Sequence, residues 1–302
     1  MHIPDGFLST AVWLGLDAAS LPAVGYLARR ARGDLEATRV PLLGVMGAFV
    51  FAAQMINFPV GVGTSGHLVG GALLAIMLGP AAAAVVMTAI LAIQALVFQD
   101  GGVLALGANV VNMALVGVLA GYVPYRLWGG ARYRDAAIFL GGFFSVLAGA
   151  ALAIGELLIS GVRIPPALVW VSLGLFSVTA ALEGAITVAV VKGIEALDPG
   201  LVRRPAGMGR AAAVIFALAA VGLAAVGVWL ASGLPDGLEK LAQTLGLEAR
   251  ARRLYATPLA DYRLPGSGAG WVSQAAAGIL GLALIYLLCL AVGRMISRRR
   301  SA

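Results

Sequence analysis

Long apolar stretches follow one another along almost the whole chain, and they restrict its fold more than any other feature. A membrane-spanning helix needs about 20 mostly apolar residues. The 302-residue sequence is 61% hydrophobic and only 12% charged, whereas soluble domains carry about 25% charged residues. The sequence therefore predicts an all-α integral membrane protein with candidate helices at residues 11–28, 40–56, 66–79, 82–99, 104–124, 135–159, 167–194, 210–231 and 271–293.

The third apolar stretch differs from the others because it is short and rich in glycine. Gly66, Gly70, Gly71 and Gly79 indicate a helix that starts in a loop or packs closely on its neighbours, rather than one that faces lipid throughout. Pro80 is expected to break the chain between the third and fourth stretches.

Basic residues gather in alternate loops, as they do on the cytoplasmic side of membrane proteins. This pattern predicts a multi-pass protein of the cell membrane, surrounded by lipid, with its amino terminus outside and its carboxyl terminus in the cytoplasm. The first ten residues contain no Lys or Arg and do not resemble a cleavable leader, so we expect Met1 to be retained. The inner segments would then carry Arg29, Arg30, Arg32, Arg39, Arg126, Arg132, Arg134, Lys192, Arg203, Arg204, Arg210, Arg294 and Arg298 to Arg300.

Loop length and charge divide the chain into two parts. We expect a seven-helix domain over residues 1–196, a polar cytoplasmic linker over 197–209, and a two-helix domain over 210–302. The outer segment 232–270 lies between the last two helices, and its charged stretch to about Arg253 is typical of a solvated or interfacial helix. Cys289 is the only cysteine, so it forms no internal disulfide, and we expect it to serve in packing or to face lipid.

The chain start is a candidate metal ligand. A free Met1 amine, the backbone nitrogen of His2 and one His2 imidazole nitrogen can close two fused chelate rings around one cation. Such a planar set of nitrogens suits Ni(II) or Cu(II) better than tetrahedral Zn(II). Pro4 disfavours helical geometry before it, which leaves residues 1–3 as an arm able to fold inward.

His67, the other histidine of the chain, follows a glycine-rich segment with glycines at positions 61, 63 and 66. Non-helical chain at membrane depth is tolerated where it is buried in protein or lines a cavity, and ionisable groups there are functional by default. We therefore predict that His67 supplies the fourth nitrogen; a structural hydrogen bond is the alternative.

Further polar residues could support the metal site, and for most of them the sequence leaves two roles open. Asp5 either caps the first helix or hydrogen-bonds the arm, and Ser65 lies close to His67 in the sequence. Asn109 and Asn112 share a helix face, so they either orient an imidazole and the glycine loop or form interhelical hydrogen bonds away from any ligand.

Several function classes are disfavoured by the sequence. Only two lysines occur, and neither follows the Gly-x-x-x-x-Gly pattern of a phosphate loop. No credible Ser-His-Asp arrangement, His-Glu-x-x-His helix or dinucleotide fingerprint is present. Although the net charge is +7, no basic stripe with interleaved aromatic residues suggests nucleic acid. We expect neither an enzyme nor a nucleic-acid-binding protein.

Three motifs resemble the nickel and cobalt substrate-binding subunits (M components) of energy-coupling-factor transporters. The start motif Met1-His2-Ile3-Pro4-Asp5-Gly6 is the most specific, since its position matters as much as its letters. The others are Thr64-Ser65-Gly66-His67-Leu68 and Asp100-Gly101-Gly102 with Asn109 and Asn112. The later segments Pro235-Asp236-Gly237-Leu238-Glu239 and Asp261-Tyr262-Arg263-Leu264-Pro265-Gly266 resemble the small two-helix N component of the same systems, so the chain resembles a fused M and N polypeptide.

This resemblance implies that Met1, His2 and His67 bind one Ni(II) or Co(II) as cargo, with Asp5, Ser65, Asn109 and Asn112 in supporting positions. It implies a membrane coupling protein and cytosolic ATPase subunits as partners, with Ala19 and Ala23 on the packing surface toward the coupling protein. We favour nickel as the cargo, and the alternative cargo is cobalt, which would serve cobalamin synthesis. A stand-alone secondary transporter and a non-transporting membrane anchor or assembly protein are the competing interpretations, although no inverted repeat is evident.

Overall fold

The computed structural model describes residues 1–61, 63–130, 132–197, 210–265 and 270–297, and the described chain is mostly helical. The predicted linker at 197–209 lies almost wholly outside these residues. The long helical segments, some of which contain a π-helical turn, are α1 (Thr10–Asp34), α2 (Val40–Gln54), α4 with η2 (Pro80–Ile93, Gln94–Phe98), α5 with η3 and α6 (Leu106–Asn109, Val110–Gly117, Val118–Trp128), α7 (Arg134–Ile159), α8 (Pro166–Leu197), α10 with η4 and α11 (Arg210–Gly222, Leu223–Gly227, Val228–Leu230) and α13 (Gly270–Ser297).

Within the described residues, eight helices are long and apolar enough to cross a membrane. The all-α membrane fold is therefore confirmed, but the nine spanning stretches are not. The third stretch forms β2 (Thr64–His67) and α3 (Gly71–Leu78), and an eight-residue helix is only about 12 Å long. Gly70 and Gly79 flank α3 with φ angles of +79° and +81°, which side chains other than glycine rarely adopt. Pro80 then starts α4, as expected.

A short antiparallel hairpin leads into α3. Strand β1 (Asn57–Gly61) pairs with β2, and Asn57 lies opposite His67. The sequence indicated a glycine-rich loop here but gave no sign of the strand pairing. Helix α8 covers the hairpin closely: a Cβ added to Gly66 would lie 2.6 Å from the Thr179 hydroxyl. The hairpin therefore holds His67 in a fixed position inside the protein.

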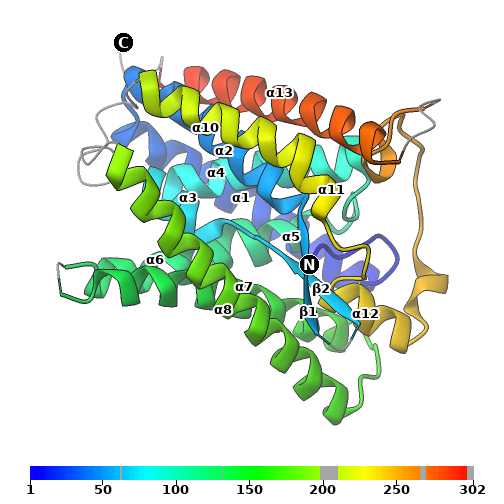
Figure 1. Ribbon diagram of the computed structural model, residues 1–302. Coiled ribbons are helices and arrows are strands. Elements are labelled where there is room, and N and C mark those ends of the chain that lie inside the picture. Colours follow the sequence, from blue (N-terminus) through cyan, green and yellow to red (C-terminus); the bar gives the residue numbers. More distant parts are fainter. Residues whose placement is uncertain (62, 131, 198–209, 266–269, 298–302) are drawn as a thin grey trace.

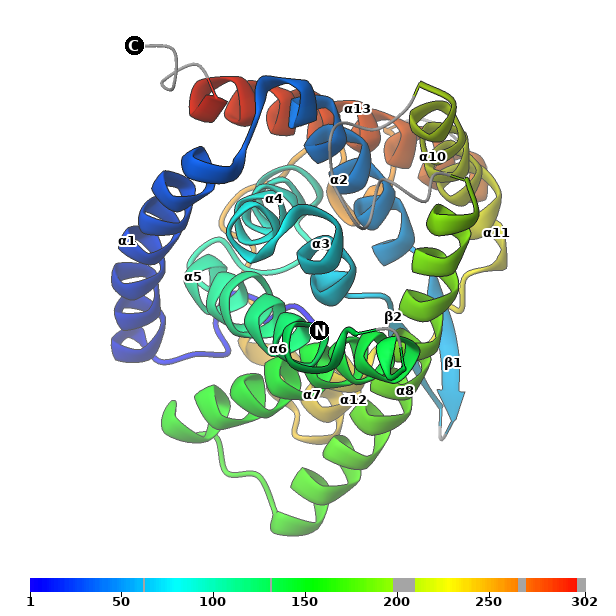
Figure 2. The same ribbon diagram turned by 90° about the vertical axis from the view of Figure 1, so that its left-hand side faces the viewer.

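Helices α3 and α4 lie at the centre of the bundle, and the other long helices surround them (Figure 2). Helix α13 packs along α2, and α10 packs on the same helix. The α2–α13 contact is close because Gly47 faces Cys289, whose sulfur would lie 3.0 Å from an added Cβ. Cys289 is thus buried packing material, one of the two roles expected from the sequence.

The outer segment folds back over the bundle instead of standing free in solvent. It contains α12 (Gly237–Thr244), η5 (Leu247–Arg250) and η6 (Ala260–Tyr262). Leu238 and Leu241 of α12 are buried, and α12 packs against α8. Charged residues such as Glu248 and Arg250 are exposed, so this segment packs on protein with its apolar side and leaves its charged side open. Figure 1 shows α12 at one side of the molecule and the carboxyl end of α13 at the opposite side.

Candidate metal centre

The first residues form an extended arm that enters the bundle. The Asn109 side chain holds this arm with two bonds: Oδ1 accepts from the Ile3 N–H at 2.8 Å, and Nδ2 donates to the Ile3 carbonyl at 3.1 Å. Gly102 also donates its N–H to the Ile3 carbonyl. The Met1 side chain lies beside Gly149, where an added Cβ would be 2.9 Å from the methionine methyl carbon. These contacts fix the chain start, which is why Met1 and Ile3 are buried.

Asp5 anchors the end of the arm. Its carboxylate accepts hydrogen bonds from the backbone N–H groups of Val103, Leu104 and Ala105, at 2.8–3.1 Å. It therefore caps the turn before α5 and not the first helix, whose N-cap residue is Ser9. The sequence suggested a cap on the first helix or a hydrogen bond to the arm, whereas the carboxylate bonds to the backbone of the 103–105 turn.

The Met1 amine meets the His67 side chain inside the protein. The amine nitrogen lies 2.9 Å from His67 Nε2, and the same amine forms an ion pair with Asp236. His67 Nδ1 lies 3.0 Å from the Leu68 carbonyl oxygen. Because a carbonyl only accepts, Nδ1 carries the proton and Nε2 turns its lone pair toward the amine. This tautomer presents His67 Nε2 as a potential metal ligand.

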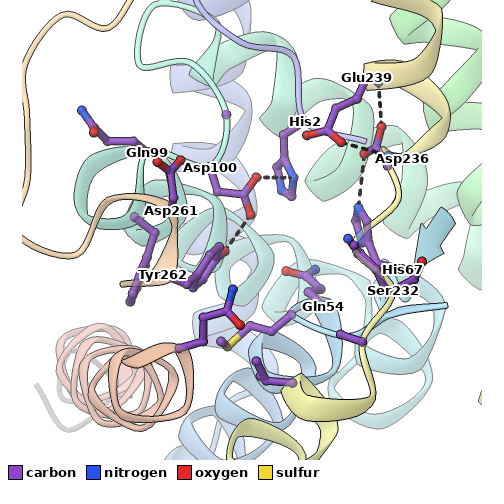
Figure 3. A pocket seen from close by; sticks show the side chains of 18 of the residues that line it. His2, Gln54, His67, Gln99, Asp100, Ser232, Asp236, Glu239, Asp261 and Tyr262 are labelled. Carbon is purple, nitrogen blue, oxygen red and sulfur yellow. Dashed lines mark hydrogen bonds and ion pairs between the residues drawn. The ribbon is translucent and has the colours of Figure 1, made fainter. Parts of the chain in front are cut away.

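His2 lies next to His67. The two imidazole rings are parallel within 7°, with centroids 5.7 Å apart. His2 Nδ1 is 3.3 Å from Asp100 Oδ1, and His2 Nε2 is 3.1 Å from Gln94 Oε1. The Tyr262 hydroxyl donates to the other oxygen of Asp100 at 2.6 Å. Figure 3 shows the His2 ring between Asp100 on one side and the pair of His67 and Asp236 on the other.

Burial and charge set the protonation of these groups. Burial, with the positive charges of the Met1 amine and His2, lowers the pKa of His67 to about 4 against the opposing effect of Asp236, so the ring is neutral at pH 7. Burial alone raises the pKa of both Asp100 and Asp236. At Asp100, His2 and the Tyr262 hydroxyl together outweigh burial, and at Asp236 the Met1 ammonium and His67 together do so. Both pKa values therefore lie below their usual range. The neutral His67 imidazole thus lies close to the Asp236 carboxylate.

A cavity of about 440 Å³ opens beside the two histidines, between the helices of the first part and the outer segment of the second. Its lining includes Gln54, Asp100, Asp236, Glu239 and Tyr262 (Figure 3). Among the described residues, no three side chains of His, Cys, Asp or Glu are placed to hold a metal ion together.

The remaining predicted residues make other contacts. Ser65 donates its hydroxyl to the Leu234 carbonyl and its N–H to the Pro235 carbonyl, so it contacts the outer segment. Asn112 donates to buried Glu156 at 2.9 Å, the interhelical bond that was the alternative. On α1, Ala19 is exposed and Ala23 is half-buried.

Sequence reasoning missed the contacts of Asp236, Gln94 and Tyr262 with the chain start and its neighbours. Asp236 carries one readable signal, because an Asp followed three residues later by Glu239 predicts a capping box at a helix start. That pattern reveals the helix but not the amine that the aspartate meets. Nothing in the sequence points to Gln94, which lies within an apolar stretch.

Comparison with known proteins shows the class of protein to which this chain belongs: it is a membrane component of nickel or cobalt transport. Residues 2–201 match the family described as cobalt uptake substrate-specific transmembrane region, and residues 210–298 match the PDGLE domain. The first match covers more than half of the chain, and the chain belongs to this cobalt uptake family, with a PDGLE domain following in the same polypeptide.

Individual relatives are named for nickel or for cobalt transport. The chain is 40% identical to the "Putative fused nickel transport protein NikMN" of Archaeoglobus fulgidus, over 97% of this chain and 98% of the relative. The "Cobalt transport protein CbiM" of Streptomyces coelicolor is 42% identical over 42% of this chain and 56% of its own length. A crystal structure of a truncated transition metal transporter is 33% identical with a TM-score of 0.57, covering 66% of this chain and 99% of that one.

Proposed function

We propose that this protein is the substrate-specific component of an ATP-driven energy-coupling-factor importer, and that it captures Ni(II) in preference to Co(II). The proposed ligands are the Met1 amine, the His2 backbone nitrogen with one imidazole nitrogen, and His67 Nε2. The observation that carries the proposal is the 2.9 Å separation between the Met1 amine and His67 Nε2.

This separation fits two neighbouring ligands of one planar ion. With metal–nitrogen bonds of about 2.0–2.1 Å, adjacent corners of a square lie about 2.8–3.0 Å apart. His67 is neutral and presents the lone pair of Nε2. His2 Nδ1 is the ring nitrogen within reach of a chelate that includes the His2 backbone nitrogen. On binding, the metal ion would replace one proton of the Met1 ammonium, the backbone proton of His2 and the proton that Nδ1 shares with Asp100, and these protons would pass to solvent. Nδ1 would then contact the metal ion in place of Asp100, while the nearby carboxylates balance the charge of the cation.

The exposure of the apolar helix α1 supports a protein partner in the membrane. Helix α1 is apolar, yet only 6% of its most hydrophobic window is buried within the chain. Its exposed face includes Leu21, with 75% of its surface accessible, and Ala19. Because the sequence lacks a phosphate loop, ATP hydrolysis falls to cytosolic ATPase subunits, and α1 offers a surface to the coupling protein. Cobalt remains the second candidate cargo because the matched family is described by cobalt uptake.

The decisive experiment compares nickel binding by the purified protein with its native start, with one alanine added before Met1, and with one alanine added after Ala302 as control. Isothermal titration calorimetry and the absorption spectrum of planar Ni(II) report affinity and geometry. We expect the amino-terminal addition to weaken binding more than about 100-fold, because second-shell changes alone cost 10–100-fold. Equal tight binding by all three proteins would remove the amine from the site.

Two further measurements separate the finer alternatives. Competition between Ni(II) and Co(II) at equal concentration tests the metal preference. Nickel accumulation in proteoliposomes, with and without the coupling and ATPase subunits, tests the energy source. Concentrative uptake by this chain alone, without ATP, would favour a secondary transporter.

A further inference from the structure

The Pro235–Glu239 segment of the second part reaches the chain start of the first part, and one of its side chains touches the proposed metal site. We propose that Asp236 is a positioning residue of that site, which orients the Met1 amine toward the metal by accepting a hydrogen bond from it. This inference rests on the proposed function. It makes the PDGLE region part of the metal site and not only a neighbour of it.

The first step is the contact itself. Asp236 Oδ2 forms an ion pair with the Met1 amine, and both groups are buried. Asp236 Oδ2 is also 3.8 Å from His67 Nε2, so the carboxylate lies on the side of the amine that faces His67. An ammonium has three N–H donors. A metal-bound amine has lost one proton and keeps two, so its bond to Asp236 persists when the lone pair turns to the metal.

The second step explains why Asp236 has one oxygen available. Its other oxygen, Oδ1, accepts the N–H groups of Leu238 and Glu239, each at 2.8 Å, and so caps α12. Glu239 in turn accepts the N–H of Asp236 at 2.9 Å, which completes a capping box. The helix cap fixes the carboxylate and directs Oδ2 at the amine.

The third step is the attachment of this segment to the metal-site hairpin. The Ser65 N–H donates to the Pro235 carbonyl at 2.8 Å, the Ser65 hydroxyl donates to the Leu234 carbonyl at 2.7 Å, and the Ser232 N–H donates to the Asn57 carbonyl at 2.7 Å. Ser65 and Asp236 form a parallel β-bridge. Ser65 therefore docks the PDGLE region beside His67, a role different from the metal-site support that the resemblance implied.

Carboxylates that hydrogen-bond metal ligands commonly orient them and raise affinity by 10–100-fold. Asp236 differs from the usual arrangement in that it holds a backbone amine and belongs to the other part of the chain, 235 residues along the sequence. A simple cap is the competing explanation, in which Asp236 stabilises α12 and has no effect on the metal.

The test measures nickel affinity and the Ni(II) absorption spectrum of Asp236→Asn in the full chain. Asn caps helices as well as Asp, but while its oxygen caps α12 its amide group presents N–H donors to the amine. We expect affinity to fall 10–100-fold, with the absorption band unchanged in position and the thermal stability of the metal-free protein close to that of the wild type. Glu239→Gln is the matched control, since it removes a charge from the same cavity and keeps an acceptor for the capping box; its affinity should change less than about threefold.

The outcomes decide between the explanations. Unchanged affinity in Asp236→Asn overturns the proposal, as does an equal loss in Glu239→Gln, which would indicate a general effect of charge. A shifted absorption band would make Asp236 a direct ligand and also overturn it. If Asp236→Asn fails to fold, Asp236→Ser, which caps but is too short to reach the amine, serves in its place. A wild-type protein that fails to bind nickel through a planar set of nitrogens refutes the proposed function instead.

Discussion

Residues 1–8, which include the arm, and the adjacent helix α1 differ in polarity and burial. The polar segment is buried and the apolar helix is exposed, which is the reverse of the usual relation. The arm carries His2 and Asp5, and its polar groups are enclosed and bonded to Asn109, Asp100 and the 103–105 turn. Helix α1 follows directly and is apolar, yet only 6% of its most apolar stretch is buried within the chain.

The difference shows what each segment is for. Burying polar groups requires a partner for each of them, and the arm has such partners from several helices. This arrangement is typical of a binding site. An apolar helix that is exposed within one chain of a membrane protein faces lipid or another membrane protein at no such cost. Changes in the arm should therefore alter metal binding, and changes on α1 should alter only what happens after binding.

The largest effect is expected at His67. Replacing His67 by Ala removes one of four proposed nitrogen ligands, so nickel affinity should fall by more than about 100-fold, beyond the range of supporting residues. The variant should still fold, because the bond of the ring to Leu68 contributes only about 1 kcal/mol. Calorimetry of the purified protein measures the affinity, and thermal unfolding checks the fold. Near-normal affinity would leave His67 with a structural hydrogen bond alone.

Asn109 should give the next largest effect. Asn109→Ala deletes both bonds to the backbone of Ile3, so the arm loses its register and nickel affinity should drop by about 10–100-fold. Asn112→Ala is the matched control one helical turn away, since Asn112 bonds to Glu156 instead of the arm. That control should lower thermal stability with little change in affinity. A comparable loss of affinity in both variants would contradict the assignment.

How far the sequence predicts this site depends on the range of the contacts. Met1, His2 and His67 could be predicted as ligands because a chain start and a glycine-rich loop are local patterns. The partners of these residues could not, since Asp236, Asp100 and Gln94 reach the chain start from segments 92 to 235 residues away. Their positions follow from how helices pack, which hydropathy does not encode.

The fold shows the same limit. Apolar length predicted the long helices, but the third stretch is equally apolar over part of its length and becomes a hairpin followed by α3. The outer segment is amphipathic, which fits both an interfacial helix and a helix packed on protein. Only the contact of Leu238 and Leu241 with the bundle decides between them.

A pair of glycines sharpens the comparison between arm and helix. At Gly102 an added Cβ would lie 2.2 Å from Asp5 Oδ1, whereas at Gly15 of α1 it would meet nothing within 4 Å. Gly102→Ala should displace the arm and weaken nickel binding by about tenfold, equivalent to ~1.4 kcal/mol. Gly15→Ala should leave affinity unchanged, and it should favour the helix slightly because alanine is the better helix former. Equal affinities in the two variants would show that the Asp5 anchor is dispensable.

The smallest effect on metal binding, with the clearest effect on transport, is expected on α1. Ala19→Leu adds bulk at an exposed position four residues before the half-buried Ala23, so the isolated chain should bind nickel as before, within about twofold. Close helix packing depends on small residues, so ATP-driven uptake by the assembled transporter should fall. Ala18→Leu is the control, because Ala18 is also exposed but lies about 100° around the helix from Ala19. If both variants reduce uptake equally, the effect belongs to the lipid-facing surface in general, and the face that carries Ala19 and Ala23 is not the docking face.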